Sequence, residues 1–277
     1  MIVRLADGYG LNVEELGQGF PLIVLHGGPG LDHSMFRPYL DPLADEFRVV
    51  YVDLRANGRS ERVDPETLSL DVFARDVDLL AAALALEEYA LLGHSFGAIV
   101  TTHHGIELGT AAGYVISGGG DSSEALLADV EESLAAMGEE RKPIAESWAR
   151  EQHVETAEDC AELMATQMPF HFAREPPAGF AAETVYSPET LRYFARQGYG
   201  DFDFAPRLGS VRRPTLVIVG SEDRTTTPRA ARVLHEGIQG SELVVLEGAG
   251  HMSYVEAQDA YLGVVRRFLR RLRGAGA

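Results

Sequence analysis

Short, continuous runs of apolar residues recur along this chain, and they constrain its fold more than any other feature of the sequence. Most of them are rich in β-branched residues, and they do not alternate regularly between polar and apolar positions. Strands of a parallel sheet that are buried on both faces have this pattern. The runs cover residues 21–26, 48–53, 89–94, 113–118, 214–220 and 242–248.

Helical patterns lie between several of these runs, at residues 70–86 and 228–238, and a last one follows at 256–273. Strands that alternate with helices are typical of a parallel sheet covered on both faces. The sequence therefore predicts an α/β fold, in which helices flank a mostly parallel central sheet.

The alternation stops after Ser117, because residues 121–205 have helical and loop-like patterns without a strong strand. In open α/β sheets, ligands bind beyond the carboxyl ends of the strands, so a helical segment inserted there would cover the site. We predict a core made of residues 1–120 and 206–277, and an inserted helical cap made of residues 121–205.

The excess of acidic residues argues against a nucleic-acid partner. The chain has 24 Lys and Arg against 42 Asp and Glu, a formal net charge of −18, which repels phosphate backbones.

No apolar run approaches the length of a membrane span, and the first residues lack the pattern of a signal peptide. Cys160 is the only cysteine, which fits a reducing compartment. We predict a cytoplasmic protein without a membrane or nucleic-acid partner, and the sequence predicts no particular oligomeric state.

Ser95 lies in the motif "GHSFG", between an apolar run and a helical pattern. A hydroxyl group buried at such a place needs a hydrogen-bonding partner. The motif G-x-S-x-G, with a strand before it and a helix after it, is typical of a tight turn that exposes a nucleophilic serine. The stretches "YALL" and "AIVTTHHGIEL" provide that context. We therefore predict that Ser95 is a nucleophile; the alternative is a structural turn serine.

A serine nucleophile needs a base to take its proton and an acid to orient the base. Along the chain, the acid and then the histidine should follow such a serine. Asp223 in "GSEDRTTTP" and His251 in "GAGHMSYVE" each follow a predicted strand, so they should lie at the same sheet edge as Ser95. The alternatives are that Asp223 only initiates a turn, that Glu222 is the acid, or that His251 is a loop histidine.

The stretch "HGGPG" at residues 26–30 follows the first predicted strand. Attack on a carbonyl group builds negative charge on its oxygen, which backbone N–H groups can stabilise. Glycine allows close approach of the backbone in this stretch. We predict that the amides of Gly28 and Phe96 form the oxyanion hole, and that His26 holds the loop rather than acting as a base.

Several stretches, taken together, resemble a known family. They are "LHGGPGLDHSMF", "VVYVDLRANGRSE", "GHSFG", "VGSEDRTTTP" and "EGAGHMSYVE", and they occur in the family's order and reach both ends of the chain. They resemble the α/β-hydrolase superfamily and, within it, the proline iminopeptidase-like branch. The resemblance implies an α/β-hydrolase fold and a serine hydrolase that removes an N-terminal residue from small peptides or related amides.

The predicted cap departs from that branch. Its members usually carry a glutamate just before a Tyr-Phe pair, where it holds the free amine of the substrate; in "SPETLRYF" that position is Thr190, and Glu189 is one residue away. The resemblance implies that Glu189, Tyr193 and Phe194 bind substrate. Two alternatives stay open: a carboxylesterase or lactonase acting on small apolar esters, and a non-catalytic ligand-binding protein of the same fold.

Metal or cofactor chemistry has little support in the sequence. His103 and His104 are adjacent and lack the H-E-x-x-H spacing of a zinc site, and no phosphate-binding or dinucleotide-binding motif follows a strand. The sequence thus predicts a hydrolase that uses neither metal nor cofactor and acts on a small molecule or a short peptide.

Overall fold

The fold is built around one sheet, which the computed structural model shows within the residues it describes, 1–139 and 141–275. The sheet has eight strands in the order β1-β2-β4-β3-β5-β6-β7-β8. The strands are β1 Ile2–Arg4, β2 Gly10–Leu16, β3 Phe20–Leu25, β4 Phe47–Val52, β5 Ala90–His94, β6 Gly113–Ser117, β7 Thr215–Gly220 and β8 Glu242–Leu246. Strand β2 pairs antiparallel with β1 and β4, and all other pairs are parallel. The predicted α/β fold with a mostly parallel sheet is therefore confirmed.

The central strands are apolar throughout because each contributes side chains to two separate cores. In β5, Leu91 belongs to one hydrophobic cluster and Leu92 to the other, and both are fully buried. Val49 and Val50 in β4 divide in the same way. Alternate residues of a strand point to opposite faces, so a sheet buried on both faces needs apolar residues at consecutive positions.

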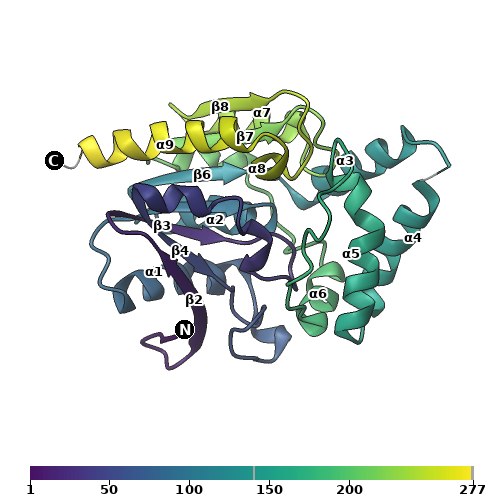
Figure 1. Cartoon of the computed structure of the whole chain (residues 1–277), viewed down its shortest axis with the longest axis horizontal. Helices are drawn as coiled ribbons and strands as arrows, with labels where there is room; N and C mark the ends of the chain where they lie inside the picture. The colour runs from purple at the N-terminus through teal and green to yellow at the C-terminus, as the bar shows by residue number, and fades with distance from the viewer. Residues whose placement is uncertain (140, 276–277) are drawn as a thin grey trace.

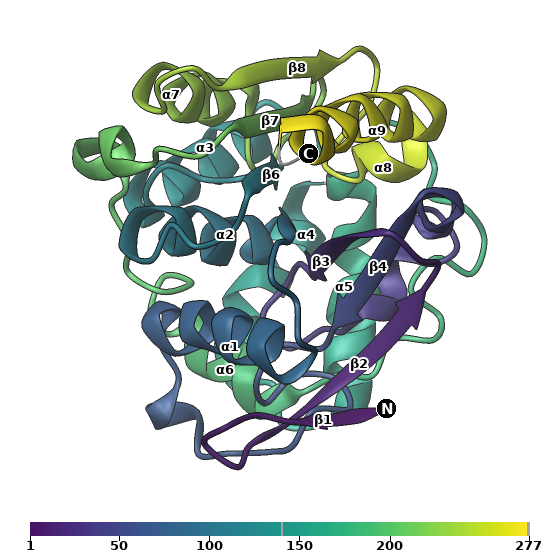
Figure 2. The ribbon, with the colours of Figure 1, turned by 90° about the vertical axis from the view of Figure 1, so that its left-hand side faces the viewer.

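Helices cover both faces of this sheet. Figure 2 shows α1 (Leu70–Ala83), α2 (Phe96–Glu107) and α7 (Pro228–Gly237) on one face and α9 (Gln258–Ala275) on the other, with the short α8 (Ser253–Glu256) beside α9. Short 3₁₀ helices lie in the connections: η1 His33–Phe36, η2 Asp41–Asp45, η3 Pro65–Thr67, η4 Glu151–His153 and η5 Ala205–Ser210.

The segment between β6 and β7 contains α3 (Ser123–Ala135), α4 (Arg141–Arg150), α5 (Ala157–His171) and α6 (Pro188–Ala195). These helices gather at one end of the core in Figure 1. The segment leaves and re-enters the core at one place, because the Ser123 N–H donates to Phe202 O (2.8 Å) and the Phe204 N–H donates to Asp121 O (2.8 Å). This arrangement is compatible with an inserted cap at residues 121–205, and the division into two domains stays a prediction.

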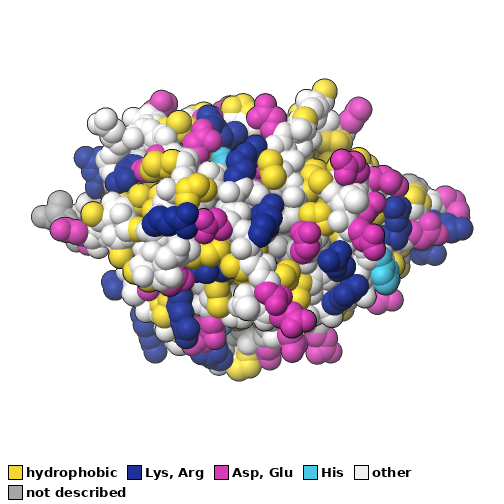
Figure 3. Space-filling view, turned by 90° about the horizontal axis from the view of Figure 1, so that it is seen from below, with side chains coloured by type: hydrophobic (Ala, Val, Ile, Leu, Met, Phe, Trp, Pro, Cys, Tyr) yellow, Lys and Arg dark blue, Asp and Glu magenta, His cyan; other side chains and the backbone are white. Residues whose placement is uncertain are grey.

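The surface carries both signs of charge. On the face shown in Figure 3, Lys and Arg side chains are interspersed with Asp and Glu side chains. Within residues 1–139 and 141–275, no helix combines the length and the apolar character needed to cross a membrane.

Candidate active site

Ser95 occupies a strained turn between β5 and α2. Its φ angle is +55°, in the left-handed region that residues other than glycine rarely adopt. The glycines of the motif are required by close contacts: a Cβ atom on Gly93 would lie 2.0 Å from Gly97 O, and one on Gly97 would lie 2.2 Å from Leu25 O. The packing around this turn therefore explains why the two positions flanking the His94–Phe96 stretch are glycines.

Asp223 and His251 lie on the loops that follow β7 and β8, and they contact each other. His251 Nδ1 is 2.9 Å from Asp223 Oδ2, and both side chains are buried. A carboxylate only accepts hydrogen bonds, so Nδ1 carries the proton and Nε2 is left as the basic nitrogen. Asp223 Oδ1 accepts the N–H groups of Thr225 and Thr226, each at 2.9 Å, so this residue also shapes the turn. Glu222, the alternative acid, is exposed.

Ser95 and His251 face the same cavity. Within the residues that the structure describes, Ser95 Oγ forms no hydrogen bond, with His251 or with any other group. Hydrogen bonds between a nucleophile and its base are often long or poorly aligned in a ligand-free site and shorten when substrate binds. The three side chains are thus brought to one place, and their roles in catalysis stay a prediction.

The predicted oxyanion donors also face this cavity. Gly28 has φ +76°, and Phe96 is the first residue of α2, where backbone N–H groups have no acceptor within the helix. Across the described part of the chain, neither amide donates to a protein acceptor. His26 holds the loop, since its Nδ1 is 2.8 Å from Gly27 O and its Nε2 accepts the Leu54 N–H at 3.1 Å. Two backbone donors are therefore free to bind an anionic oxygen beside Ser95.

The cavity has a volume of about 380 Å³ and is lined mainly by the helices inserted between β6 and β7. The inserted helices contribute to its apolar wall Leu126, Leu127, Val130, Leu134, Ala145, Trp148, Ala149, Met164, Leu191 and Ala195. The sequence predicts none of these positions, because nothing in the helical pattern of this segment indicates which face meets the core.

One buried carboxyl group interrupts the apolar wall. Glu151 is 4% exposed, and its side chain accepts hydrogen bonds from Gln167 Nε2 (2.7 Å) and the Tyr199 hydroxyl (2.5 Å). Burial raises the pKa of Glu151 above its usual value. Glu131 is a second acid on the lining. The cavity is thus apolar with acidic groups contributed by the inserted helices.

The three residues predicted to bind substrate lie elsewhere. Glu189 is exposed at the start of α6, and Phe194 is buried against Phe73 and Phe96, with ring centroids 5.7 and 5.0 Å apart. Tyr193 stacks edge-on against Phe194. These residues dock α6 onto the core, and none of the three lines the cavity, which α6 reaches through Leu191 and Ala195. The structure thus places these three residues outside the cavity wall, and their contact with substrate stays a prediction.

Two more histidines pack against His251. The ring centroids of His94 and His171 lie 4.7 and 5.4 Å from that of His251. Burial, together with the proximity of His251, lowers the pKa of His94 well below the usual value and that of His171 to about 3. His251 is therefore flanked by two imidazoles that stay neutral near pH 7.

These buried neutral histidines predict a loss of stability in acid. In the unfolded chain a histidine takes up a proton as the pH falls below about 6.5, whereas the folded chain cannot protonate His171 until about pH 3. We expect the free energy of unfolding, measured by urea titration, to fall from pH 7 to pH 5. His171→Phe should reduce that slope by about 1 kcal/mol per pH unit. An unchanged slope in the variant would contradict this explanation.

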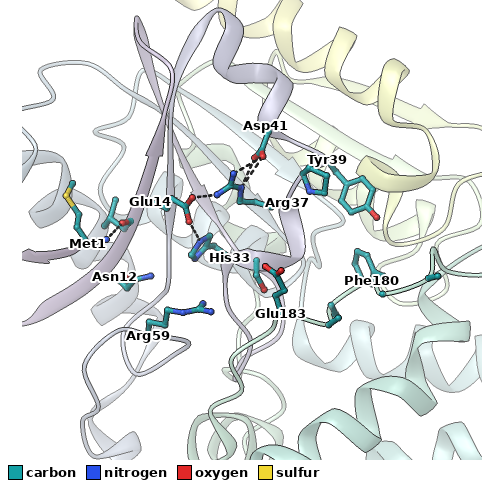
Figure 4. Close-up of a pocket in the computed structure, with 17 residues that line it drawn as sticks. Met1, Asn12, Glu14, His33, Arg37, Tyr39, Asp41, Arg59, Phe180 and Glu183 are labelled. Carbon is teal, nitrogen blue, oxygen red and sulfur yellow. Dashed lines mark hydrogen bonds and ion pairs between the residues drawn. The ribbon is translucent and has the colours of Figure 1, made fainter.

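A larger cleft, of about 820 Å³, lies apart from Ser95. Figure 4 shows Arg37 paired with Glu14 and Asp41, and His33 beside Glu14. Arg59, at another edge of the cleft, pairs with the buried Asp32 at 2.6 Å. The cationic side chains of this cleft are bound to carboxylates of the protein, whereas the smaller cavity contains a candidate nucleophile, base and oxyanion hole.

Comparison with known proteins shows the family of this chain. The fold and the comparisons together define a hydrolase. The characteristic pattern described as the alpha/beta hydrolase family matches residues 22–264, and the chain belongs to that family.

Individual relatives differ in activity. The chain is 28% identical over 269 residues to a proline iminopeptidase of Lactobacillus acidophilus, covering 90% of this chain and 89% of that protein. Among solved structures, it resembles proline iminopeptidase of Mycobacterium smegmatis (TM-score 0.81, 23% identity, 100% and 99% of the two chains). It also resembles an esterase of Exiguobacterium antarcticum (TM-score 0.76, 20% identity, 98% and 99%). The predicted resemblance to proline iminopeptidases is confirmed, and at these identities the two structures show the fold alone.

Proposed function

We propose that this protein is a serine hydrolase that works through an acyl-enzyme. Ser95 Oγ attacks a carbonyl carbon while His251 Nε2 takes its proton, and Asp223 keeps the imidazole oriented. The N–H groups of Gly28 and Phe96 hold the oxyanion. His251 then gives the proton to the leaving group, and water releases the acyl group by the reverse sequence. The observation that carries the proposal is the 2.9 Å contact between Asp223 and His251 at the cavity that also exposes Ser95.

We further propose that the substrate is a small peptide or related amide from which an N-terminal residue is removed. The sequence similarity to a proline iminopeptidase supports this assignment. An enzyme of that kind needs a carboxylate near the acyl site to bind the substrate's ammonium group, and the buried Glu151 is better placed for this than the exposed Glu189. A bound ammonium would favour the ionised form of Glu151 and so offset its burial.

Cleavage of small apolar esters or lactones is the second candidate. It is supported by the mainly apolar wall of the cavity and by the hydrogen bonds that already occupy the Glu151 carboxyl group. An ester needs the pocket and the oxyanion hole but no amine-binding acid. The single buried cysteine, Cys160, agrees with a cytoplasmic location for either activity.

The two candidates differ in the effect expected for Glu151→Gln. If Glu151 binds an ammonium group, the variant should lose roughly 10- to 100-fold in kcat/KM on proline β-naphthylamide, because a charge-assisted hydrogen bond is removed. Its kcat/KM on a short p-nitrophenyl ester should stay within about 3-fold of the unmodified protein, a difference below 1 kcal/mol.

Glu131→Gln is the matched control, because it makes the same chemical change at another acid on the cavity lining. It should leave the ratio of amide to ester turnover unchanged. Equal loss on both substrates in Glu151→Gln, or ester turnover without any amide turnover in the unmodified protein, would assign the esterase function instead.

A further inference from the structure

The loop that carries His251 is attached to the end of helix α5 through the carboxylate of Glu256. This carboxylate accepts the Gly250 N–H at 2.7 Å, one residue before His251. It also accepts the N–H groups of Ala173, at 3.0 and 3.2 Å, and Arg174, at 3.0 Å, which directly follow α5. One side chain therefore binds three backbone donors from two segments that are about 80 residues apart in the sequence.

The two segments touch closely around this carboxylate. A Cβ atom on Gly250 would lie 2.7 Å from Ala173 N and 2.9 Å from His171 O, so only glycine fits at this position without displacement. The Met252 N–H donates to His171 O at 3.3 Å. The backbone on both sides of His251 is thus in contact with the last residue of α5 or with the residues that follow it.

The same helix end also contacts the loop of Asp223. His171 Nδ1 is 2.8 Å from Thr225 Oγ1, and the Thr225 N–H donates to Asp223 Oδ1 at 2.9 Å. The His171 ring lies against the His251 ring, with centroids 5.4 Å apart. Since α5 also supplies Met164, Gln167 and His171 to the cavity, one helix joins the substrate-binding wall to the supports of the base.

We infer that Glu256 is a positioning residue, which couples the seating of α5 to the placement of His251. The inference rests on the proposed function, in which His251 is the base. When α5 is seated, Glu256 and the contacts of Gly250 hold the imidazole against Asp223. When α5 moves away, the loop loses its acceptor and the base loses its fixed position. The position of α5 in the cavity wall and the ability of His251 to act as a base are therefore linked.

The test uses three variants of the full chain: Glu256→Gln, Glu256→Ala and, as the matched control, Glu247→Gln. Glu247 lies on the loop that carries His251 and is exposed, and among the described residues it has no polar partner. The first readout is the second-order rate of labelling by a fluorophosphonate, which replaces fluoride with the serine oxygen and depends on the base. We expect rates about 10-fold lower for Gln, which keeps one acceptor oxygen, and about 100-fold lower for Ala, with the control unchanged.

The second readout separates positioning from a loss of folding. The pH profile of labelling should change in Glu256→Gln, because His251 is no longer held against Asp223. Amide hydrogen exchange should increase together at residues 172–174 and 249–252 and stay unchanged in the strands of the sheet. Glu256→Gln alone is sufficient if Glu256→Ala does not fold.

These experiments distinguish failure of the Glu256 inference from failure of the proposed hydrolase function. Labelling of both Glu256 variants at the rate of the unmodified protein, with the same pH profile, would overturn the inference and leave the hydrolase proposal intact. If the unmodified protein is not labelled, the hydrolase proposal fails. In that case, amide hydrogen exchange in Glu256→Gln still tests the coupling. An increase at only one of the segments 172–174 and 249–252 would overturn it, and an increase at both would support it.

Discussion

Ser95→Ala is expected to lower kcat by roughly 10⁶-fold on whichever amide or ester the protein hydrolyses, because the variant lacks the only atom proposed to form the acyl bond. The turn itself should persist, since alanine differs from serine only by the hydroxyl group and the Ser95 hydroxyl makes no hydrogen bond within the described residues. The measurement is steady-state turnover, together with circular dichroism to show that the variant folds.

Ser187→Ala is a suitable control for this prediction. Ser187 is fully buried, whereas Ser95 is partly exposed, and the Ser187 hydroxyl also has no hydrogen-bonding partner among the residues that the structure describes. Its backbone N–H donates to Gly30 O at 2.8 Å, a contact that alanine keeps. We expect turnover close to that of the unmodified protein. Retention of more than one hundredth of the activity in Ser95→Ala would rule out Ser95 as the nucleophile.

Asp223→Asn is expected to lower kcat by about 10⁴-fold while leaving the fold unchanged. The amide oxygen can still accept the N–H groups of Thr225 and Thr226, so the turn has its acceptor. The amide nitrogen, however, would donate toward His251 Nδ1 and favour the tautomer with its proton on Nε2, where Ser95 needs a base. Steady-state kinetics and a thermal unfolding midpoint test both parts of this prediction.

Glu222→Gln distinguishes the two acids that the sequence allows. Its side chain is exposed, so we expect nearly unchanged turnover. A large loss in Glu222→Gln, combined with a small loss in Asp223→Asn, would assign the role of the orienting acid to Glu222.

The parts of the fold that the sequence predicts are those with a local signal. The strands β3 to β7 appear as apolar runs because both of their faces are largely buried, as Leu91 and Leu92 illustrate. The edge strand β8 is also an apolar run, although Val245 is exposed. The strands β1 and β2 were missed. In β2, which pairs with strands on both sides, buried Leu11 and Val13 alternate with Asn12 and Glu14, and this alternation covers too few residues to predict a strand.

The candidate site also has a part that the sequence predicts and a part that it does not. Ser95, Asp223 and His251 each follow a strand, so the parallel sheet alone brings them to one edge. The cavity wall depends instead on how α3 to α6 pack. Glu151 is one of many acids in that segment, and nothing local marks it as buried, whereas the aromatic Tyr193 and Phe194 are used to dock α6 onto the core.

Ala56 has an unusual backbone conformation for an alanine. Its φ angle is +60°, in the left-handed region that favours glycine. An alanine in the left-handed region carries strain of about 1 kcal/mol. Two hydrogen bonds of the Ala56 backbone help to hold this strained conformation. Its N–H donates to the Tyr9 hydroxyl at 2.9 Å, and its carbonyl oxygen accepts from Thr190 Oγ1 at 2.9 Å.

The most direct test of the account is to locate the adduct formed with a fluorophosphonate at pH 7 by peptide mass mapping. The account predicts one phosphonylated site, Ser95, in the unmodified protein, and strongly slowed labelling in His251→Ala. An adduct on a different residue, or equal labelling of Ser95→Ala and the unmodified protein, would contradict the claim that Ser95, His251 and Asp223 act together.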